Sequence, residues 1–148
     1  MKELLDLLSN RALWACLVSW AAAQGSKVLI CRLVDKKWDW KRFFGLGGMP
    51  SSHSSVVCTI AMSAGIMRGF GSLEFAMMLI LALVVMTDAS GVRREAGQHA
   101  RILNRILDDM KQNDNALSHD TLKELLGHSP FEVLVGALLG VLVAFAVM

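Results

Sequence analysis

Four stretches without a charged side chain recur along the chain and constrain its fold more than any other feature. They are residues 12–26, 54–67, 75–87 and 133–148, and the segments between them hold nearly all the charge. Uncharged apolar runs are typical of helices that cross a bilayer, and a hydrophobic content of 54% exceeds what one soluble core of this size needs. Each run is shorter than the roughly 20 residues that a spanning helix requires, so we expect the helices to extend into flanking Gly, Ser and capping residues.

These runs predict a single all-α domain over residues 1–148, an integral membrane bundle of about four spanning helices with short interfacial or cytoplasmic helices. The alternative is a soluble protein whose helices are hydrophobic all round, because short apolar runs also fit buried core helices.

The positive charge is placed unevenly between the two sides of such a bundle. With four spans, residues 32–42 and 93–123 share one side and carry most of the Lys and Arg, whereas the other side receives only Lys2, Arg11 and Arg68. The positive-inside rule then puts both polar segments in the cytoplasm and both termini outside.

Capping residues mark where the helices begin. Asn10 precedes the first span, Ser72 the third, and Ser129 opens a capping box with Glu132. Residues 1–10 and a segment starting at residue 121 are predicted as short amphipathic helices. In the last span Gly136 and Gly140 form a small-xxx-small pair that can let two helices approach closely, which suggests a homodimer, although glycine is common in membrane helices.

A glycine-rich loop runs into a serine-rich helix start at residues 45–55. Free amides at a helix N-terminus favour an anion, so this segment predicts a phosphate site. Its binding groups are Gly48, Ser51, Ser52 and Ser54, and His53 beside them is placed to protonate a leaving alkoxide. The alternative is that the serines cap the helix and His53 bonds a carbonyl.

A second polar cluster, residues 88–99, follows the third span and therefore reaches the same side. Arg93 and Arg94 are suited to clamp phosphate oxygens, and a neutral His99 to attack phosphorus. Arg93 and His99 are six residues apart and face different sides of an unbroken helix, so a shared site requires a bend at residues 90–91 or at Gly97. Alternatively, the arginine pair is only a topology anchor.

Together these segments resemble the phosphatidic acid phosphatase type 2 superfamily, and most closely its short divergent bacterial branch, which is related to acid phosphatases and vanadium-dependent haloperoxidases. The resemblance rests on residues 50–53 (Pro-Ser-Ser-His), on Arg93 followed by His99, and on residues 127–133. It implies His99 as nucleophile, His53 as acid, and Lys27 with Arg93 as phosphate ligands. It also implies a site without metal or cofactor, in the bacterial plasma membrane.

The chain departs from the superfamily pattern at three places. Val34 and Asp35 stand where the first motif has Arg-Pro, Ser52 replaces a glycine, and Leu103 occupies the position of the aspartate that orients the nucleophile. The remaining candidates for orienting or lining the site are Asp88, Glu95 and His128. Lys27 has a second interpretation as a lysine that reaches from the membrane to the interface, and His128 as one that satisfies a local carbonyl.

The leading functional prediction is a membrane phosphatase or phosphotransferase that acts on a phosphorylated lipid or isoprenoid through a phosphohistidine. The competing prediction is a non-catalytic protein that binds or moves an anionic phospholipid, and a haloperoxidase comes third. The small net charge of +2 argues against nucleic acid as a partner. A metal site made by His53, His99 and Asp88 is conceivable, but no ligand spacing on one helix supports it.

Overall fold

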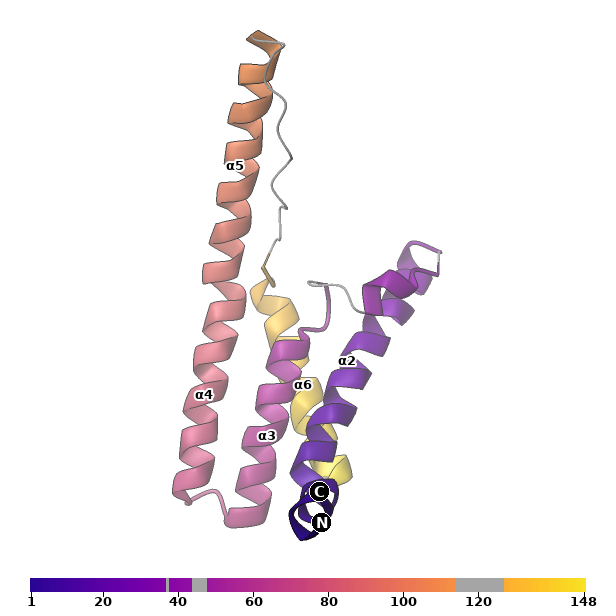
Figure 1. The fold of residues 1–148 in the computed structure, drawn as a ribbon, viewed down its shortest axis with the longest axis vertical. Helices are drawn as coiled ribbons and strands as arrows, with labels where there is room; N and C mark the ends of the chain where they lie inside the picture. Colours follow the sequence, from indigo (N-terminus) through magenta and orange to yellow (C-terminus); the bar gives the residue numbers. More distant parts are fainter. Residues whose placement is uncertain (37, 44–47, 114–126) are drawn as a thin grey trace.

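Each of the four apolar stretches lies in a helix in the computed structural model, which describes residues 1–36, 38–43, 48–113 and 127–148. The described part of the chain contains no strand. Its elements are, in order, α1 (Lys2–Leu8), α2 (Arg11–Val34), the 3-10 helix η1 (Trp40–Phe43), α3 (Ser52–Arg68), α4 (Leu73–Ser90), α5 (Val92–Asn113) and α6 (Pro130–Val147) (Figure 1). The apolar stretches correspond to α2, α3, α4 and α6, so the all-helical fold is confirmed.

The predicted capping residues set the helix starts. The Asn10 side chain accepts a hydrogen bond from the amide of Leu13 at 3.1 Å, and the Ser72 hydroxyl accepts one from the amide of Phe75 at 3.2 Å. Ser129 and Glu132 form both bonds of the expected capping box. By taking in these flanking residues, α2 reaches 24 residues and both α4 and α6 reach 18.

Three helical segments are long and apolar enough to cross a membrane: Arg11–Val34, Leu73–Asp108 and Pro130–Val147. The helix α3 has 17 residues and packs against α2, α4 and α6. Because its neighbours shield it, α3 does not need the apolar surface that a lipid-facing helix requires. A bundle of about four spans agrees with this arrangement.

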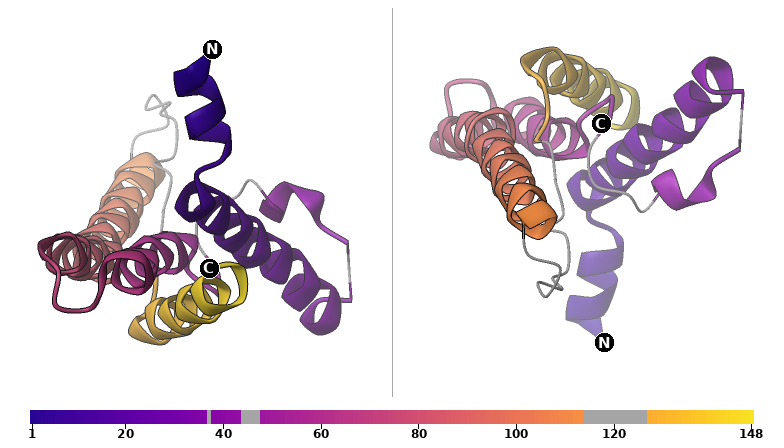
Figure 2. Two further views of the ribbon diagram at one scale, coloured as in Figure 1. Left: turned by 90° about the horizontal axis from the view of Figure 1, so that it is seen from below. Right: turned by 90° about the horizontal axis from the view of Figure 1, so that it is seen from above.

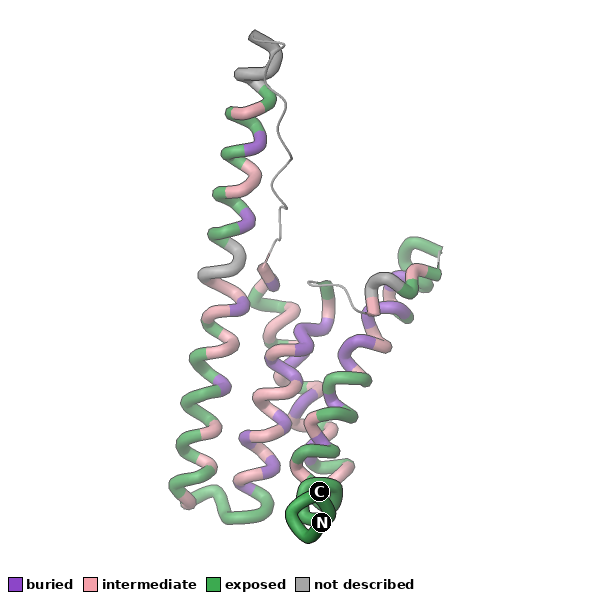
Figure 3. The backbone as a smooth tube through the Cα atoms, in the orientation of Figure 1, coloured by how far each residue is buried: buried purple, intermediate pink, exposed green. Residues whose placement is uncertain are grey.

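Many buried side chains of the bundle are polar, whereas its exposed side chains are largely apolar. The largest fully buried side chains are small and polar, namely Thr59, Ser19, Ser51, Ser54, Ser55 and Ser63. Large aliphatic side chains instead cover the outside of α4 and α6, among them Ile80, Val84, Leu138 and Leu142. Figure 3 shows the buried positions concentrated on α3 and the sides of α2 and α6 that face it. A continuous apolar exterior around a polar interior suits lipid and not water, which excludes the soluble alternative.

Both termini lie at one end of the bundle (Figure 1). The Arg11 guanidinium donates hydrogen bonds to the carbonyl oxygens of Val147, at 2.9 Å, and Met148. The helix predicted near residues 1–10 is present as α1 and projects sideways from this end (Figure 2). At the opposite end α3 and α6 begin, and α2 and α4 end, as the predicted topology requires.

The polar segment after α4 forms one long helix. The helix α5 follows α4 after a break at Gly91, and the two form a rod that extends beyond the other helices (Figure 1). The short helix expected after residue 121 lies outside the described residues.

Gly136 and Gly140 allow a close helix approach. A Cβ atom at Gly136 would overlap the carbonyl oxygen of Ser51, and one at Gly140 would overlap that of Ser55. Both glycines therefore allow α6 to pack closely against α3 of the same chain. The close contact that the pair allows is made within one chain here, and a homodimer stays a prediction.

We expect Thr59→Val to lower the free energy of unfolding by about 1–3 kcal/mol, the cost of leaving buried polar groups without a partner. The Thr59 hydroxyl lies 2.8 Å from the Ser19 hydroxyl on α2 and 2.9 Å from the carbonyl oxygen of Gly140 on α6, so it links three helices. Thr87→Val is the matched control, because the exposed Thr87 bonds only within its own helix. Unfolding in mixed detergent micelles measures both variants, and an equal loss in the two would contradict the role of this hydroxyl.

Candidate functional site

The starts of α3 and α6 are joined directly at one end of the bundle. The amide of Ser51 donates a hydrogen bond to the carbonyl oxygen of Glu132 at 3.1 Å. Two helix N-termini thus lie side by side, and the positive dipole end of each favours an anion, although several of their amides are bonded by the caps Ser51, Ser129 and Glu132.

The predicted serines hold this junction together. Ser51 is the N-cap of α3, and its hydroxyl accepts hydrogen bonds from the amide of Ser54 at 3.4 Å and from the Ser54 hydroxyl at 3.0 Å. Ser51 and Ser54 are fully buried, and Ser52 is nearly so. The capping interpretation is therefore correct for Ser51. Gly48, the last predicted ligand of this segment, is exposed and has a φ of 82°.

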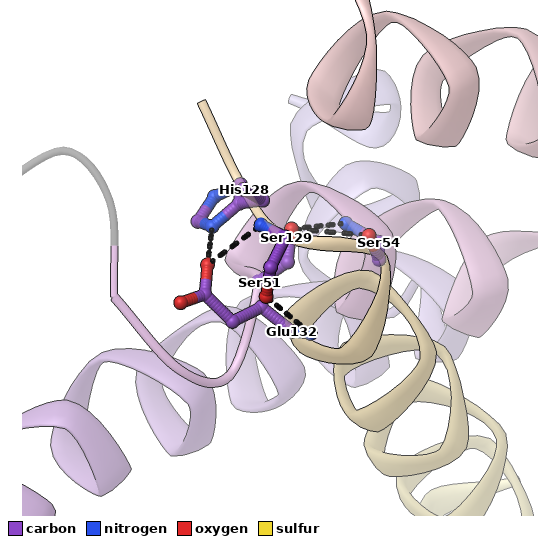
Figure 4. Close-up of polar contacts among 5 residues, drawn as sticks. All are labelled: Ser51, Ser54, His128, Ser129 and Glu132. Carbon is purple, nitrogen blue, oxygen red and sulfur yellow. Dashed lines mark hydrogen bonds and ion pairs between the residues drawn. The ribbon is translucent and has the colours of Figure 1, made fainter. Parts of the chain in front are cut away.

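Two imidazole rings lie next to each other beside this junction. His53 lies in the first turn of α3, half-buried, and its ring centroid is 6.1 Å from that of His128, at an interplanar angle of 62°. His128 is 4% exposed, and its Nδ1 atom lies 3.0 Å from Oε2 of Glu132 (Figure 4). The same Oε2 atom accepts a hydrogen bond from the amide of Ser129 at 3.2 Å. The capping carboxylate of α6 thus also holds the ring of His128.

Lys27 is the cation that the structure brings to this group. It lies in the second half of α2, is only 5% exposed, and is subject to the attraction of the Glu132 carboxylate. A lysine that merely reached to the interface would expose its ammonium to water. The burial of Lys27 therefore favours a role in the site over the interfacial interpretation.

A cavity of about 530 Å³ opens beside Glu132. Its lining comes from α5 on one side and from the start of α6 on the other: Gln98, Arg101, Ile102, Arg105, Gly127, Ser129 and Glu132. The two arginines outnumber the Glu132 carboxylate, so the lining has a net positive charge that favours an anion such as phosphate.

The remaining predicted residues lie on α4 and α5. Asp88 is half-buried in the last turns of α4, and Glu95 is exposed at the start of α5. His99 is exposed and is not among the residues that line the cavity. The side chains of Arg93 and Arg94 lie outside the described part of the structure. The helix α5 runs through Gly97 without a break, so the bend that a shared site of Arg93 and His99 requires is not present there.

Sequence reasoning missed Arg101, Arg105 and Gln98, and it took Glu132 only as a capping residue. The signal for the first three was their spacing, since positions 98, 101 and 105 share one face of a helix. The signal for Glu132 was its position four residues after His128, within reach on the same helix start.

The assembled group combines functions that phosphoryl chemistry needs. It holds a largely buried lysine, two imidazoles, a carboxylate that bonds to one of them, and two helix N-termini. Among the described residues no cluster of three or more His, Cys, Asp or Glu is arranged to hold a metal ion. The chemistry available here is acid-base and nucleophilic, with positive charge to stabilise an anion.

Two comparisons with known proteins match this chain over most of its length. A family described as "Divergent PAP2 family" matches residues 8–143. The membrane protein YuiD of Bacillus subtilis (strain 168), described as uncharacterized, is 38% identical to this chain. The match covers 93% of this chain and 94% of the relative. No solved structure shows a significant match.

Proposed function

The chain belongs to the divergent PAP2 family of membrane proteins, and from that membership and the site geometry we propose that it is a phosphatase or phosphotransferase for a phosphorylated lipid or isoprenoid. The family name alone assigns no reaction, because a divergent family can keep a fold and lose its chemistry. The proposal therefore rests on the residues of the site.

One observation carries the proposal: the starts of α3 and α6 are bonded to each other, the rings of His53 and His128 pair beside them, and the charge of Lys27, which is 5% exposed, interacts with Glu132 of that group. Burying a lysine among polar groups is costly unless an anion compensates for it. Glu132 supplies part of that compensation, and a phosphoryl group supplies the rest when it binds. Because the site lies where four helices meet a membrane surface, its substrate is an anion that the membrane itself presents.

The reaction that fits these groups passes through a phosphohistidine. A neutral imidazole attacks phosphorus, the bond from phosphorus to the alkoxide oxygen breaks, and His53 in its imidazolium form gives its proton to the leaving alcohol. Water then attacks phosphorus and gives a proton to His53, and the phosphorus-nitrogen bond breaks to release phosphate. Lys27 and the helix amides neutralise the charge on the equatorial oxygens. The sequence-based candidates for nucleophile and clamp remain His99 and Arg93.

We place the site on the cytoplasmic face of the bacterial plasma membrane. The polar segments at the site end of the bundle carry most of the Lys and Arg, and the positive-inside rule retains such segments in the cytoplasm. A lipid phosphate in the inner leaflet then reaches the site without leaving the membrane surface.

The second candidate function is the binding or movement of an anionic phospholipid without catalysis. The sequence favours it at one position, since Val34 and Asp35 stand where the superfamily has an Arg-Pro pair. Losing one preorganised donor typically costs about 3 kcal/mol of transition-state stabilisation.

Phosphate release from purified protein distinguishes these two functions. We expect the protein in dodecyl maltoside micelles to release phosphate from dioleoyl phosphatidic acid or farnesyl diphosphate, and orthovanadate to inhibit by imitating the pentavalent transition state. If no phosphate is released while phosphatidic acid still raises the melting temperature, the binding function is correct.

Lys27→Met is expected to reduce kcat/KM for phosphatidic acid by roughly 10²–10³-fold, the effect of removing one preorganised group from a buried anion site. Methionine keeps the length and the apolar part of the side chain while removing the charge. The control is Arg68→Gln, which removes an exposed cation at the opposite end of the bundle, 4.0 Å from Glu74. Equal activity of Lys27→Met and wild type would remove Lys27 from the site.

A further inference from the structure

His128 is the most firmly positioned imidazole among the described residues. Its backbone amide donates a hydrogen bond to the carbonyl oxygen of Ala89, at 3.0 Å, which ties it to the end of α4. Its ring is bound to Glu132 of α6 at 3.0 Å and is 95% shielded from solvent. The bond to Ala89 fixes the backbone of His128, and the ring cannot turn without breaking its bond to Glu132.

The bond to Glu132 also decides which ring nitrogen carries the proton. A carboxylate only accepts hydrogen bonds, so Nδ1 of His128 must be the donor. In a neutral imidazole the proton on Nδ1 leaves a lone pair on Nε2. The same arrangement, a carboxylate on one imidazole nitrogen, orients histidines for nucleophilic and base chemistry in other sites.

The rings of His53 and His128 lie close enough together to act on one phosphoryl group. The ring centroids of His53 and His128 are 6.1 Å apart. A phosphoryl group bound beside both rings is therefore within reach of both, with the buried Lys27 near the carboxylate that holds one of them.

His99 has none of these features. It is exposed on α5, and Leu103 stands four residues after it, where His128 has Glu132. Glu95 stands four residues before His99, but both side chains are exposed, so water screens any attraction between them.

We propose that His128 is the nucleophile of this site, that Glu132 is its positioning residue, and that His53 is the acid. This inference rests on the proposed function, in which it assigns the role of nucleophile to His128 instead of His99. Nε2 of His128 attacks phosphorus, the bond to the leaving oxygen breaks, and that oxygen takes the proton of the His53 imidazolium. The intermediate carries the phosphoryl group on Nε2 of His128 while Nδ1 keeps its proton and its bond to Glu132. Water then attacks phosphorus, gives its proton to His53, and frees Nε2.

The test is to find which histidine carries the phosphoryl group in the wild-type protein. The protein in dodecyl maltoside micelles is mixed with phosphatidic acid labelled with ³²P in its headgroup and quenched in alkali, which preserves phosphohistidine, and its peptides are mapped. We expect the label on the peptide that contains His128. Label on the His99 or the His53 peptide overturns the inference and leaves the proposed function intact, whereas a wild type that neither becomes labelled nor releases phosphate overturns both.

Two variants extend the test. His128→Gly is expected to lose labelling and turnover and to recover turnover when free imidazole is added, because the added ring replaces the missing nucleophile. A purely structural role of His128 would give no such recovery. Glu132→Gln keeps a hydrogen-bond acceptor for Ser129 and His128 but removes the charge, so we expect kcat to fall at least 10-fold with KM little changed. His128→Gly that keeps wild-type turnover, without imidazole, overturns the inference.

Discussion

Replacing His53 by Asn is expected to lower the rate of phosphate release from dioleoyl phosphatidic acid by about 10²–10⁴-fold, the range that general acid catalysis contributes. His53 belongs to the first turn of α3, and its ring lies next to that of His128. The proton of its imidazolium is therefore close to a phosphoryl group bound beside both rings. Asparagine fills much of the same space and can donate a hydrogen bond, but it cannot give up a proton near neutral pH.

The leaving group separates the loss of an acid from damage to the site. A p-nitrophenolate ion leaves without protonation, so His53→Asn should slow p-nitrophenyl phosphate hydrolysis much less than phosphatidic acid hydrolysis. The melting temperature of the variant is measured in the same micelles. A loss of the same size for both esters would contradict the role of His53 as the acid.

Gly140→Ala is expected to destabilise the bundle by at least about 3 kcal/mol, the upper part of the range for overpacked cores. The added methyl group would overlap the backbone carbonyl oxygen of Ser55 and press on the Cβ atom of Cys58, neither of which belongs to a side chain that can rotate away. The helix α6 must then move off α3, and the bond from Thr59 to the Gly140 carbonyl is lost with it.

Gly25→Ala is the matched control for this substitution. Gly25 also lies within a spanning helix, but a Cβ atom there would meet no atom within 4 Å. Alanine is favoured over glycine in a helix by about 1 kcal/mol, so this variant should be as stable as the wild type or slightly more so. If both variants lower the unfolding free energy equally, the contact between α3 and α6 is not what Gly140 provides.

The helices and their starts could be predicted from the sequence because they depend on local chemistry. A run of apolar residues after Asn10, Ser72 or Ser129 needs no partner to be recognised, and all three caps formed their expected bonds. The extent of α5 was not predicted, since its apolar residues are interrupted by charge and its length depends on continuing from α4.

The partners of individual side chains were predictable only in part. The serines at the start of α3 and the closeness of His53 to the helix start followed from the sequence. The close contact between Gly136 on α6 and the Ser51 backbone could not be predicted from the sequence. A glycine pair indicates that another helix approaches closely, but it does not indicate which helix. The role of Glu132 was hidden for a similar reason, since its carboxylate serves the Ser129 amide and the His128 ring at once.

The hydroxyl-lined interior has a consequence for the thermodynamics of this fold. When the helices separate within a bilayer, their outer aliphatic surface stays in hydrocarbon, and the groups newly uncovered are mainly Ser, Thr, Gly and Ala. Heat-capacity increments in water-soluble proteins arise from apolar surface that becomes hydrated, and very little is hydrated here. The enthalpy of helix association is therefore nearly constant with temperature, and the bundle lacks the driving force that weakens on cooling and causes cold denaturation.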